Sequence, residues 1–484
     1  MARCAIGEAA FAWHTHCERL RIMIRIFSHY VSRNLVFLVV LDSLVLMLAA
    51  CVGTSFQLSA TGNASEFVDL VQQAGVFALA VLVVMTSTGV YQLDYWQDVQ
   101  ARLARLVAAA LLGVVVASLI WYLTLSSYWG PKAIIITVTL ALAGSVFARF
   151  ACSKWGNAGA LKRRVLVIGT GSRVMKLAEF AQRNRNHDVV GYLAAQSSQH
   201  YVPLSRVLAM TPGESLLSFV KRYGVDQIVL AVRDRRDGGL PLQELLECRL
   251  NGVKITELTT FFECEYRQLM LESLNPSWMV LGDGFRQGFL RATVKRLFDL
   301  TVSAVLLVLT LPIMLIAALC ILIESGLPVL YRQERCGEGG RVFTLYKLRS
   351  MRNNAESGGT PRWAAASDDR TTRVGQIIRK LRIDELPQII NVFKGEMSFV
   401  GPRPERPFFV DQLVKQIPYY SLRHCIKPGI TGWAQVSYPY GSSVDDAIEK
   451  LQYDLYHVKN HSLFLDIMIL IATVEVVLWG RGAR

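Results

Sequence analysis

Four long apolar segments precede residue 151 and constrain the fold more than any other feature of the chain. Each approaches the roughly 20 residues that a helix needs to cross the hydrocarbon core of a bilayer. We therefore predict a four-helix transmembrane bundle over residues 35–150, preceded by a cytoplasmic N-terminal segment over residues 1–34. The predicted spans run from about Leu35 to Val52, Ala74 to Val90, Leu106 to Leu125 and Ala133 to Phe150.

The charges that flank these segments predict which ends lie in the cytoplasm. Residues 1–34 contain five arginines, whereas residues 53–73 contain no Lys or Arg and carry Glu66 and Asp69. Positive charge is enriched in cytoplasmic loops, so the N-terminus is placed inside and four crossings return the chain there. Asp42 lies within the first span, where an ionisable group is costly. We interpret Asp42 as a group that snorkels or caps a neighbour rather than as a functional one.

The overall composition narrows the class of protein further. The net charge of +14 fits a membrane surface or an anionic substrate. No nucleic-acid partner is expected, because basic and aromatic residues do not interleave in a groove-binding pattern. The nine cysteines are scattered singly, which suits reduced thiols facing the cytosol. The first 22 residues lack an apolar core of signal-peptide length; translation starts at Met1 or Met23, and we favour Met23.

Residues 151–275 change to short β-rich runs that alternate with helical patterns, which is typical of a small doubly wound α/β domain. The first turn reads Gly169-Thr-Gly171-Ser-Arg-Val174, so valine replaces the third glycine of a dinucleotide fingerprint. We therefore predict a degenerate Rossmann-like (CoA-binding-like) domain with a structural, regulatory or assembly role. The expected strands are Val165–Ile168, Val189–Leu193, Gln227–Val232 and Val253–Ile255.

A second membrane element is expected over residues 297–323. Basic residues flank it on both sides, and Pro312 interrupts it, which removes a hydrogen bond and forces a kink. We predict a re-entrant helix that enters the membrane, bends at Pro312 and leaves by the same face. The apolar segment 462–479 contains Asp466 and Glu475, so we interpret it as a helix at the interface or against the catalytic domain; a fifth crossing is the alternative.

The residues best suited to chemistry are the adjacent acids Asp384 and Glu385. A strongly basic amphipathic helix leads into them, and a new helix begins there and ends at Gly395. Taken alone, Asp384 is a good helix N-cap. A helix start surrounded by arginines also binds phosphate, beside which an Asp can attack a phosphoryl group and a Glu can bind Mg²⁺. The candidate phosphate-binding residues around the pair are Lys347, Arg349, Arg373, Arg379, Arg403 and Arg423.

At this point the chain resembles the bacterial sugar transferase family, the monotopic polyprenyl-phosphate phosphoglycosyl transferases. The resemblance covers about residues 291–480, and the spans and Rossmann-like domain before it are similar to the long form of the family. One departure is Leu311, which precedes Pro312 where some relatives have serine. The motifs are Lys295-Arg-Leu-Phe-Asp299, Tyr331-Arg-Gln-Glu-Arg335, Lys347-Leu-Arg-Ser-Met351, Arg382-Ile-Asp-Glu-Leu-Pro-Gln388, Gly401-Pro-Arg-Pro-Glu405 and Pro428-Gly-Ile-Thr-Gly-Trp-Ala-Gln435.

The resemblance implies a catalytic domain over residues 276–480 on the cytoplasmic face of the bacterial inner membrane, mainly α-helical and carrying the re-entrant helix. It implies a ping-pong reaction in which Asp384 attacks the β-phosphate of a UDP-sugar and UMP leaves. Undecaprenyl phosphate then accepts the phosphosugar. Glu385, with Asp384, would bind Mg²⁺, and UDP-glucose is the preferred donor by family frequency. A homodimer and downstream glycosyltransferases are the expected protein partners.

Two other classes of protein share parts of this pattern. Membrane-bound nucleotide-sugar dehydratases have four spans and a similar cytosolic domain, but they need an intact NAD fingerprint and a Tyr-x-x-x-Lys pair. The spacing Tyr128 to Lys132 contains Pro131 and falls in an outer loop, so we disfavour this class. A non-enzymatic scaffold that binds a nucleotide is disfavoured by the retained acidic and cationic motifs.

Overall fold

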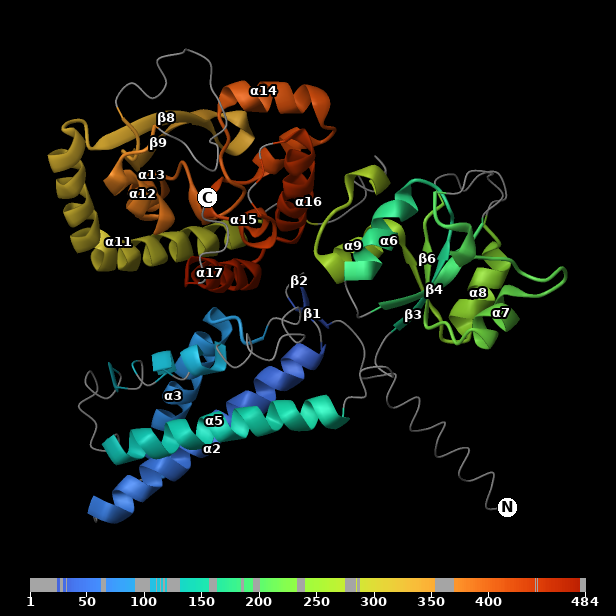
Figure 1. The fold of residues 1–484 in the computed structure, drawn as a ribbon, viewed down its shortest axis with the longest axis horizontal. Coiled ribbons are helices and arrows are strands. Elements are labelled where there is room, and N and C mark those ends of the chain that lie inside the picture. Colours follow the sequence, from blue (N-terminus) through green and yellow to red (C-terminus); the bar gives the residue numbers. More distant parts are fainter. Residues whose placement is uncertain are drawn as a thin grey trace.

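The computed structural model has three parts, which we name after the roles predicted for them: a membrane bundle, a Rossmann-like domain and a catalytic domain (Figure 1). It describes residues 24–26, 29–31, 33–61, 67–91, 105–109, 111–113, 115, 118–119, 131–155, 163–183, 187–194, 201–232, 240–274, 284, 288–352, 370–439, 441 and 443–478.

Three predicted spans form long helices in the membrane bundle. They are α2 (Arg33–Thr61), α3 (Phe67–Ser87) and α5 (Pro131–Trp155). Their buried residues form one apolar cluster that includes Leu46, Phe77 and Ala141. Half of the third predicted span, 106–125, lies outside the described residues. Among the described residues, three helices are long and apolar enough to cross a membrane, and two of them belong to this bundle.

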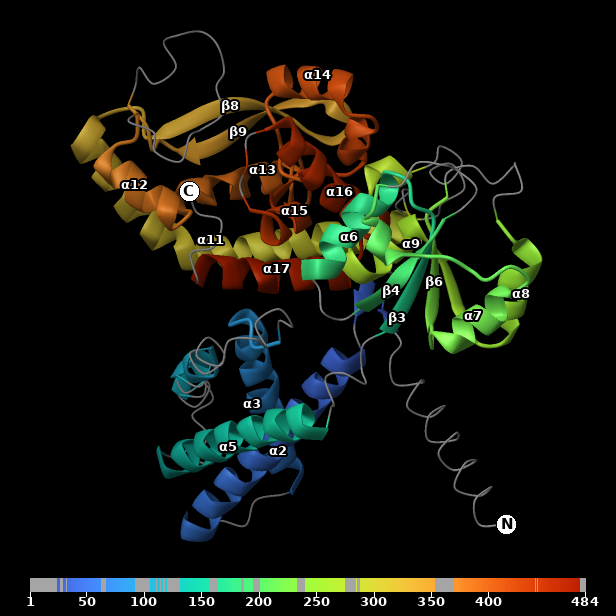
Figure 2. The same ribbon diagram turned by 45° about the vertical axis from the view of Figure 1, so that its right-hand side comes forward.

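The third such helix is α11 (Phe289–Ser325), a continuous 37-residue helix with Pro312 inside it. Figures 1 and 2 show α11 as two arms that meet at a bend. The first arm lies beside α17 (Leu463–Leu478), and the second returns toward the hairpin of β8 (Leu330–Cys336) and β9 (Val342–Leu348). Proline lacks the N–H for the helical hydrogen bond and is the usual cause of a sharp bend. Apolar side chains on both arms are exposed, including Val308 at 73% and Ile323 at 78%.

The Rossmann-like domain is a five-stranded parallel sheet in the order β5-β4-β3-β6-β7, with helices on both faces. All four predicted strands are present; the short β5 was not foreseen. α6 and α9 pack on one face, and α7 and α8 pack on the other. The elements are β3 (Arg163–Ile168), α6 (Arg173–Arg183), β4 (His187–Leu193), β5 (Val207–Leu208), α7 (Leu216–Arg222), β6 (Gln227–Leu230), α8 (Leu242–Leu250), β7 (Lys254–Glu257) and α9 (Leu258–Tyr266).

The glycine turn of this domain serves packing. Gly169 has φ +125°, and a side chain there would press on Ala231 of the neighbouring strand end. Val174, at the position of the third fingerprint glycine, is fully buried in the core between the sheet and α6. In the dinucleotide fingerprint the third glycine lets the helix pack closely on the strand. Here the valine side chain occupies that position in the core.

The catalytic domain contains one antiparallel hairpin and one short parallel pair of strands within a mainly helical frame. Its elements after α11 are β8 (Leu330–Cys336), β9 (Val342–Leu348), α12 (Arg373–Lys380), the 3-10 helix η6 (Ile383–Gln388), α13 (Ile389–Lys394), β10 (Ser398–Val400), α14 (Pro407–Gln416), the 3-10 helix η7 (Tyr420–Cys425), β11 (Gly429–Thr431), α15 (Trp433–Ser437), α16 (Val444–Asn460) and α17 (Leu463–Leu478).

Helix α17 packs against the catalytic domain, as one of the two interpretations of segment 462–479 expects. Leu465 and Ile469 are fully buried in the core of that domain. Asp466 is also buried and contacts Lys295 Nζ at 2.9 Å and His457 Nε2 at 3.1 Å. At 16 residues, α17 would extend only about 24 Å, short of the roughly 30 Å hydrocarbon core.

Polar contacts join the three parts of the molecule. Glu263 of α9 accepts bonds of 2.8 Å from Lys459 of α16 to both of its carboxylate oxygens. The bundle meets α17 where Arg105 approaches Glu475 at 3.4 Å. The N-terminal hairpin of β1 (Ile24–Ile26) and β2 (His29–Val31) inserts His29 against Tyr456 of α16. The catalytic domain is therefore fixed against both of its neighbours.

Candidate active site

Asp384 and Glu385 lie in the first turn of η6, and both are buried, at 8% and 9% exposure. The structure corrects the interpretation of Asp384 as an N-cap. Arg382 occupies that position in the left-handed conformation, φ 53°, and no side chain caps the helix. The helical run ends at Gly395, φ 82°, as predicted. Freed from a capping role, the Asp384 carboxylate is available for chemistry.

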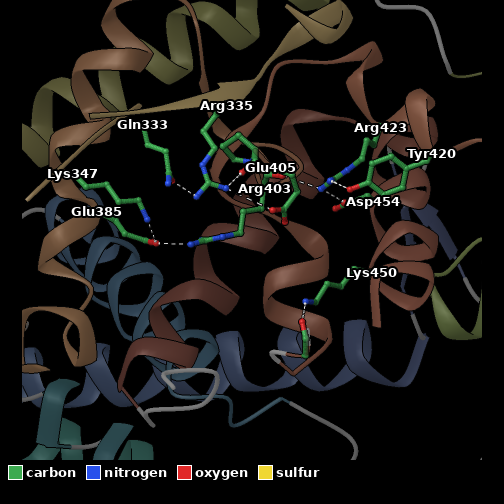
Figure 3. Close-up of polar contacts among 12 residues, drawn as sticks. Gln333, Arg335, Lys347, Glu385, Arg403, Glu405, Tyr420, Arg423, Lys450 and Asp454 are labelled. Atoms are coloured by element: carbon green, nitrogen blue, oxygen red, sulfur yellow. Dashed lines mark hydrogen bonds and ion pairs between the residues drawn. The ribbon is translucent and has the colours of Figure 1, made fainter. Parts of the chain in front are cut away.

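Three cationic side chains surround the Glu385 carboxylate, and Figure 3 shows two of them, Lys347 and Arg403. Arg403 Nη2 and Lys347 Nζ lie 2.9 Å and 3.2 Å from Oε1, and Arg382 Nη1 lies 3.5 Å from Oε2. Burial alone would raise the pKa of Glu385, but these three cations outweigh it and hold that pKa well below its usual range. Glu385 is therefore ionised whenever the cations are in place.

The Asp384 carboxylate has a different environment. Within the part of the chain that the structure describes, no side-chain hydrogen bond to it is found. Burial raises the pKa of Asp384 to about 6; the charge of Glu385 adds to this rise, while Lys347, Arg379 and Arg403 oppose it. Asp384 is thus mostly ionised at pH 7 but more basic than an ordinary aspartate, which suits a nucleophile.

Arg403 reaches the site from a loop that β10 and β11 hold in place. These two strands pair in parallel, and Gly401 and Gly429 meet so closely that a side chain on either would overlap the backbone of the other segment. The segment Pro428-Gly-Ile-Thr-Gly432 provides the other half of this contact. It forms β11 and packs behind the Arg403 loop, so its glycines serve close backbone contact.

Of the other four predicted phosphate-binding arginines, only Arg379 is found to act on the acidic pair among the described residues. Arg379 of α12 acts electrostatically on Asp384, whereas Arg373 is exposed at the start of that helix. Arg349 turns away from the pair: its Nη2 donates to the carbonyl oxygens of Ser325 and Gly326, at 2.9 and 2.7 Å, and so caps the C-terminus of α11. Arg423 lies behind Arg403 and donates to its main-chain oxygen at 2.9 Å. Phosphate binding by these four arginines stays a prediction.

Arg335 is a site residue that motif reading included without assigning a role. It lies on β8, where its Nη1 donates to Pro404 O at 3.0 Å and its Nη2 to Gln333 Oε1 at 2.6 Å (Figure 3). The available signal was the spacing Tyr331-Arg-Gln-Glu-Arg335 on a strand, which places Gln333 and Arg335 on one face. Sequence alone does not reveal that this face meets the Arg403 loop.

The acidic pair offers a fit for Mg²⁺ that is incomplete without a substrate. No group of three or more His, Cys, Asp or Glu side chains that could hold a metal is found among the described residues. Among the described residues, no side chain is hydrogen-bonded to the Asp384 carboxylate, and the contact found for Glu385 Oε2 is the one of 3.5 Å to Arg382. Two carboxylates plus diphosphate oxygens and water are the ligands that Mg²⁺ usually takes, so the pair fits Mg²⁺ bound together with a diphosphate.

A buried acidic pair ringed by cations, beside a bent apolar helix, defines a membrane-associated protein with an anion site. Residues 290–480 match the family model described as bacterial sugar transferase. The chain belongs to the bacterial sugar transferase family.

Several relatives are named as transferases that use undecaprenyl phosphate. The chain is 40% identical over 259 residues to the UDP-N-acetylgalactosamine-undecaprenyl-phosphate N-acetylgalactosaminephosphotransferase of Aeromonas hydrophila, covering 54% of this chain and 60% of that protein, less than two thirds of its length. It is 33% identical over 333 residues to the UDP-glucose:undecaprenyl-phosphate glucose-1-phosphate transferase of Xanthomonas campestris pv. campestris, covering 66% and 68%. A protein of the same name from Caulobacter vibrioides is 41% identical over 191 residues, covering 39% and 71%.

Proposed function

We propose that the chain transfers hexose 1-phosphate from a UDP-sugar to undecaprenyl phosphate and releases UMP. The observation that carries this proposal is the cluster of cations at the buried acidic pair. Four cations act on one or both carboxylates: Lys347, Arg379, Arg382 and Arg403. Arginine and lysine side chains gathered at one site are suited to bind phosphate groups, and a nucleotide diphosphate offers two of these.

In the first step of the proposed reaction, a carboxylate oxygen of Asp384 attacks the β-phosphorus of the UDP-sugar. The bond from that phosphorus to the bridging oxygen breaks, and UMP leaves with the electron pair. Arg403 and Lys347 stabilise the charge that develops on the phosphoryl oxygens. Glu385 holds these two cations in position while its own charge keeps Asp384 basic.

In the second step, an oxygen of undecaprenyl phosphate attacks the phosphorus of the aspartyl phosphosugar. The acyl phosphate bond breaks, Asp384 regains its carboxylate, and the product is undecaprenyl diphosphate sugar. When bound, Mg²⁺ would neutralise diphosphate charge. Asp384 and Glu385 Oε2 are the groups that would hold it.

The membrane placement that we propose brings the lipid acceptor to this site. Four spans with the N-terminus inside would leave the catalytic domain on the cytoplasmic face of the inner membrane. The contact between Arg105 and Glu475 supports this placement, because Arg105 directly precedes the third predicted span and Gly89, whose oxygen accepts a 2.8 Å bond from Arg105, lies at the end of the second. The exposed apolar arms of α11 would then enter and leave the same leaflet, as a re-entrant helix.

The identity of the transferred sugar is the most detailed part of the proposal. The names of the relatives divide between N-acetylgalactosamine and glucose. We propose a UDP-hexose donor and keep UDP-glucose as the first choice. A panel of UDP-glucose, UDP-galactose and their 2-acetamido forms, each supplied with Mg²⁺ and undecaprenyl phosphate in detergent, identifies the donor by the rate of UMP release.

The test of the mechanism is Asp384→Asn. We expect UMP release and transfer to lipid to fall by at least about a thousandfold, because the amide is not a nucleophile. Without acceptor, the unchanged protein should gain the mass of one hexose phosphate, and Asp384→Asn should not. Arg249→Lys, an exposed change on α8, is the control. Full turnover by Asp384→Asn would contradict the covalent mechanism, and no UMP release by the unchanged protein with any donor would contradict the function.

A further inference from the structure

The loop that carries Arg403 has few main-chain hydrogen-bond donors of its own. Residues 401–405 read Gly-Pro-Arg-Pro-Glu, and we call this segment the strap. Pro402 and Pro404 have no N–H to donate, so Arg403 N–H is the only main-chain donor within residues 402–404. The carbonyl groups of the strap therefore need donors from other segments.

The structure shows these groups. Four consecutive strap carbonyls, from residue 402 to residue 405, each accept a hydrogen bond from another segment. Two of the donors are backbone N–H groups and two are arginine side chains. The bonds are Gly429 N to Pro402 O at 3.0 Å, Arg423 Nη2 to Arg403 O at 2.9 Å, Arg335 Nη1 to Pro404 O at 3.0 Å and Cys336 N to Glu405 O at 2.9 Å.

The side chain that donates to the Arg403 carbonyl is that of Arg423, and it is buried. The Arg423 side chain is only 6% exposed, and it also donates to Asp454 Oδ2 at 2.8 Å and to the Tyr420 hydroxyl at 2.7 Å (Figure 3). Asp454, on α16, is 2% exposed and balances the charge. A guanidinium with these three acceptors, almost fully enclosed, has no path to a phosphate without leaving Asp454 buried and uncompensated.

We infer that Arg423 and Arg335 are positioning residues that fix Arg403 through the main chain of the strap and do not bind substrate. The inference rests on the proposed function, in which the Arg403 side chain works beside Glu385 at 2.9 Å. Fixing the backbone on both sides of Arg403 places its guanidinium before substrate arrives, so little reorganisation is needed in the reaction. The bond to the Arg403 carbonyl makes Arg423 the more important of the two.

A double-mutant cycle between Arg423→Lys and Arg403→Ala tests this role. Lysine keeps the charge beside Asp454 but cannot reach three acceptors with a planar fork. We expect Arg423→Lys to lower kcat about tenfold to a hundredfold, with a smaller change in KM, because a displaced catalytic group loses transition-state contacts. In the Arg403→Ala background the same change should cost less than about twofold, because its effect passes through Arg403. Arg335→Lys should behave in the same way, with a smaller loss.

The readouts separate the possible outcomes. Equal losses of kcat from Arg423→Lys in both backgrounds would overturn the inference. Such a result would mean that Arg423 contacts the substrate directly or that the change destabilises the protein. A thermal melt, run beside the control Arg249→Lys, distinguishes these two explanations. The four proteins are also titrated with UDP, so the cycle can be measured in Kd as well as in turnover. Absence of UMP release by the unchanged protein would count against the proposed function, and the UDP cycle would still decide the role of Arg423.

Discussion

Two buried carboxylates, one in the membrane bundle and one in the catalytic domain, are compensated in different ways. Asp42 is fully buried and meets one guanidinium: Arg149 Nη1 and Nη2 lie 3.0 Å and 2.9 Å from its two oxygens. The Tyr91 hydroxyl donates a further bond of 2.8 Å. Glu385 instead meets three cations and has Asp384 as its neighbour.

The difference separates a structural acid from a functional one. At Asp42 the two charges cancel and both carboxylate oxygens are satisfied within the protein, which supports the interpretation of Asp42 as structural. Asp42 does not snorkel, however, because it is enclosed by its partner. At Glu385 three cations meet one carboxylate, and the Arg403 side chain keeps 35% of its surface exposed. A cluster of several partly exposed cations is therefore a candidate ligand site, whereas the enclosed one-to-one pair at Asp42 is not.

The largest effect on stability is expected when Arg149 is replaced by leucine. This change leaves the Asp42 carboxylate buried without its counter-charge, which should lower the free energy of unfolding by about 3–5 kcal/mol. Turnover per folded molecule should stay close to that of the unchanged protein, because the pair has no excess charge to offer a substrate. The unfolding midpoint in detergent and the UMP-release rate measure the two quantities.

The matched control removes both partners. Asp42→Leu combined with Arg149→Met should recover most of the lost stability, because a buried ion pair and an apolar pair of similar volume are often close in free energy. A double variant as unstable as Arg149→Leu, or a large loss of turnover in it, would show that the pair does more than hold the bundle together.

The opposite balance of effects is expected for Glu385→Gln. The amide cannot hold Arg403 and Lys347 as a carboxylate does, so the two cations lose their common anchor. We expect kcat/KM to fall about a hundredfold, the cost of losing one preorganised charged contact. Glu385→Asp, which keeps the charge on a shorter stem, should lose less. Unchanged turnover in Glu385→Gln would remove Glu385 from the mechanism.

The sequence predicted features whose cause is local. The strands of the Rossmann-like domain follow from short apolar runs. The closeness of Asp384 and Glu385 follows from their being neighbours in the sequence. The direction of a long side chain has no local cause. Arg349 caps a helix end 23 and 24 residues earlier, and Arg423 pairs with Asp454, 31 residues later.

The same reason explains the error at the start of η6. Asp384 has the residue type and the following Pro387 of a good N-cap, but the chain enters from α12 through Arg382 in a left-handed turn, which starts the helix two residues earlier. The packing of α12 against η6 determines the conformation of that turn, and helix propensities of single residues do not predict such packing.

The pH dependence of turnover tests the unusual environment of Asp384. The pKa of Asp384 is raised to about 6, and only the ionised form can attack phosphorus. As pH falls through 6 the group gains a proton, so kcat should fall by about tenfold for each further unit of pH. In Glu385→Gln the fall should begin at a lower pH, because the charge of Glu385 helps to raise the pKa of Asp384. A fall centred near pH 4 in the unchanged protein would contradict this assignment.

The smallest effect is expected from Arg379→Gln, which sharpens the comparison by removing one of the cations that act on Asp384. Arg379 lowers the pKa of Asp384, so its loss should move the acid limb of the kcat profile to higher pH. Because Arg379 is partly exposed, screening by water should limit the shift to less than about one unit. Lys380→Gln removes an exposed charge next to it on α12 and is the control. Equal shifts in both variants would indicate a general field of the basic helix, whereas a shift confined to Arg379→Gln would place that arginine among the charges that set the Asp384 nucleophile.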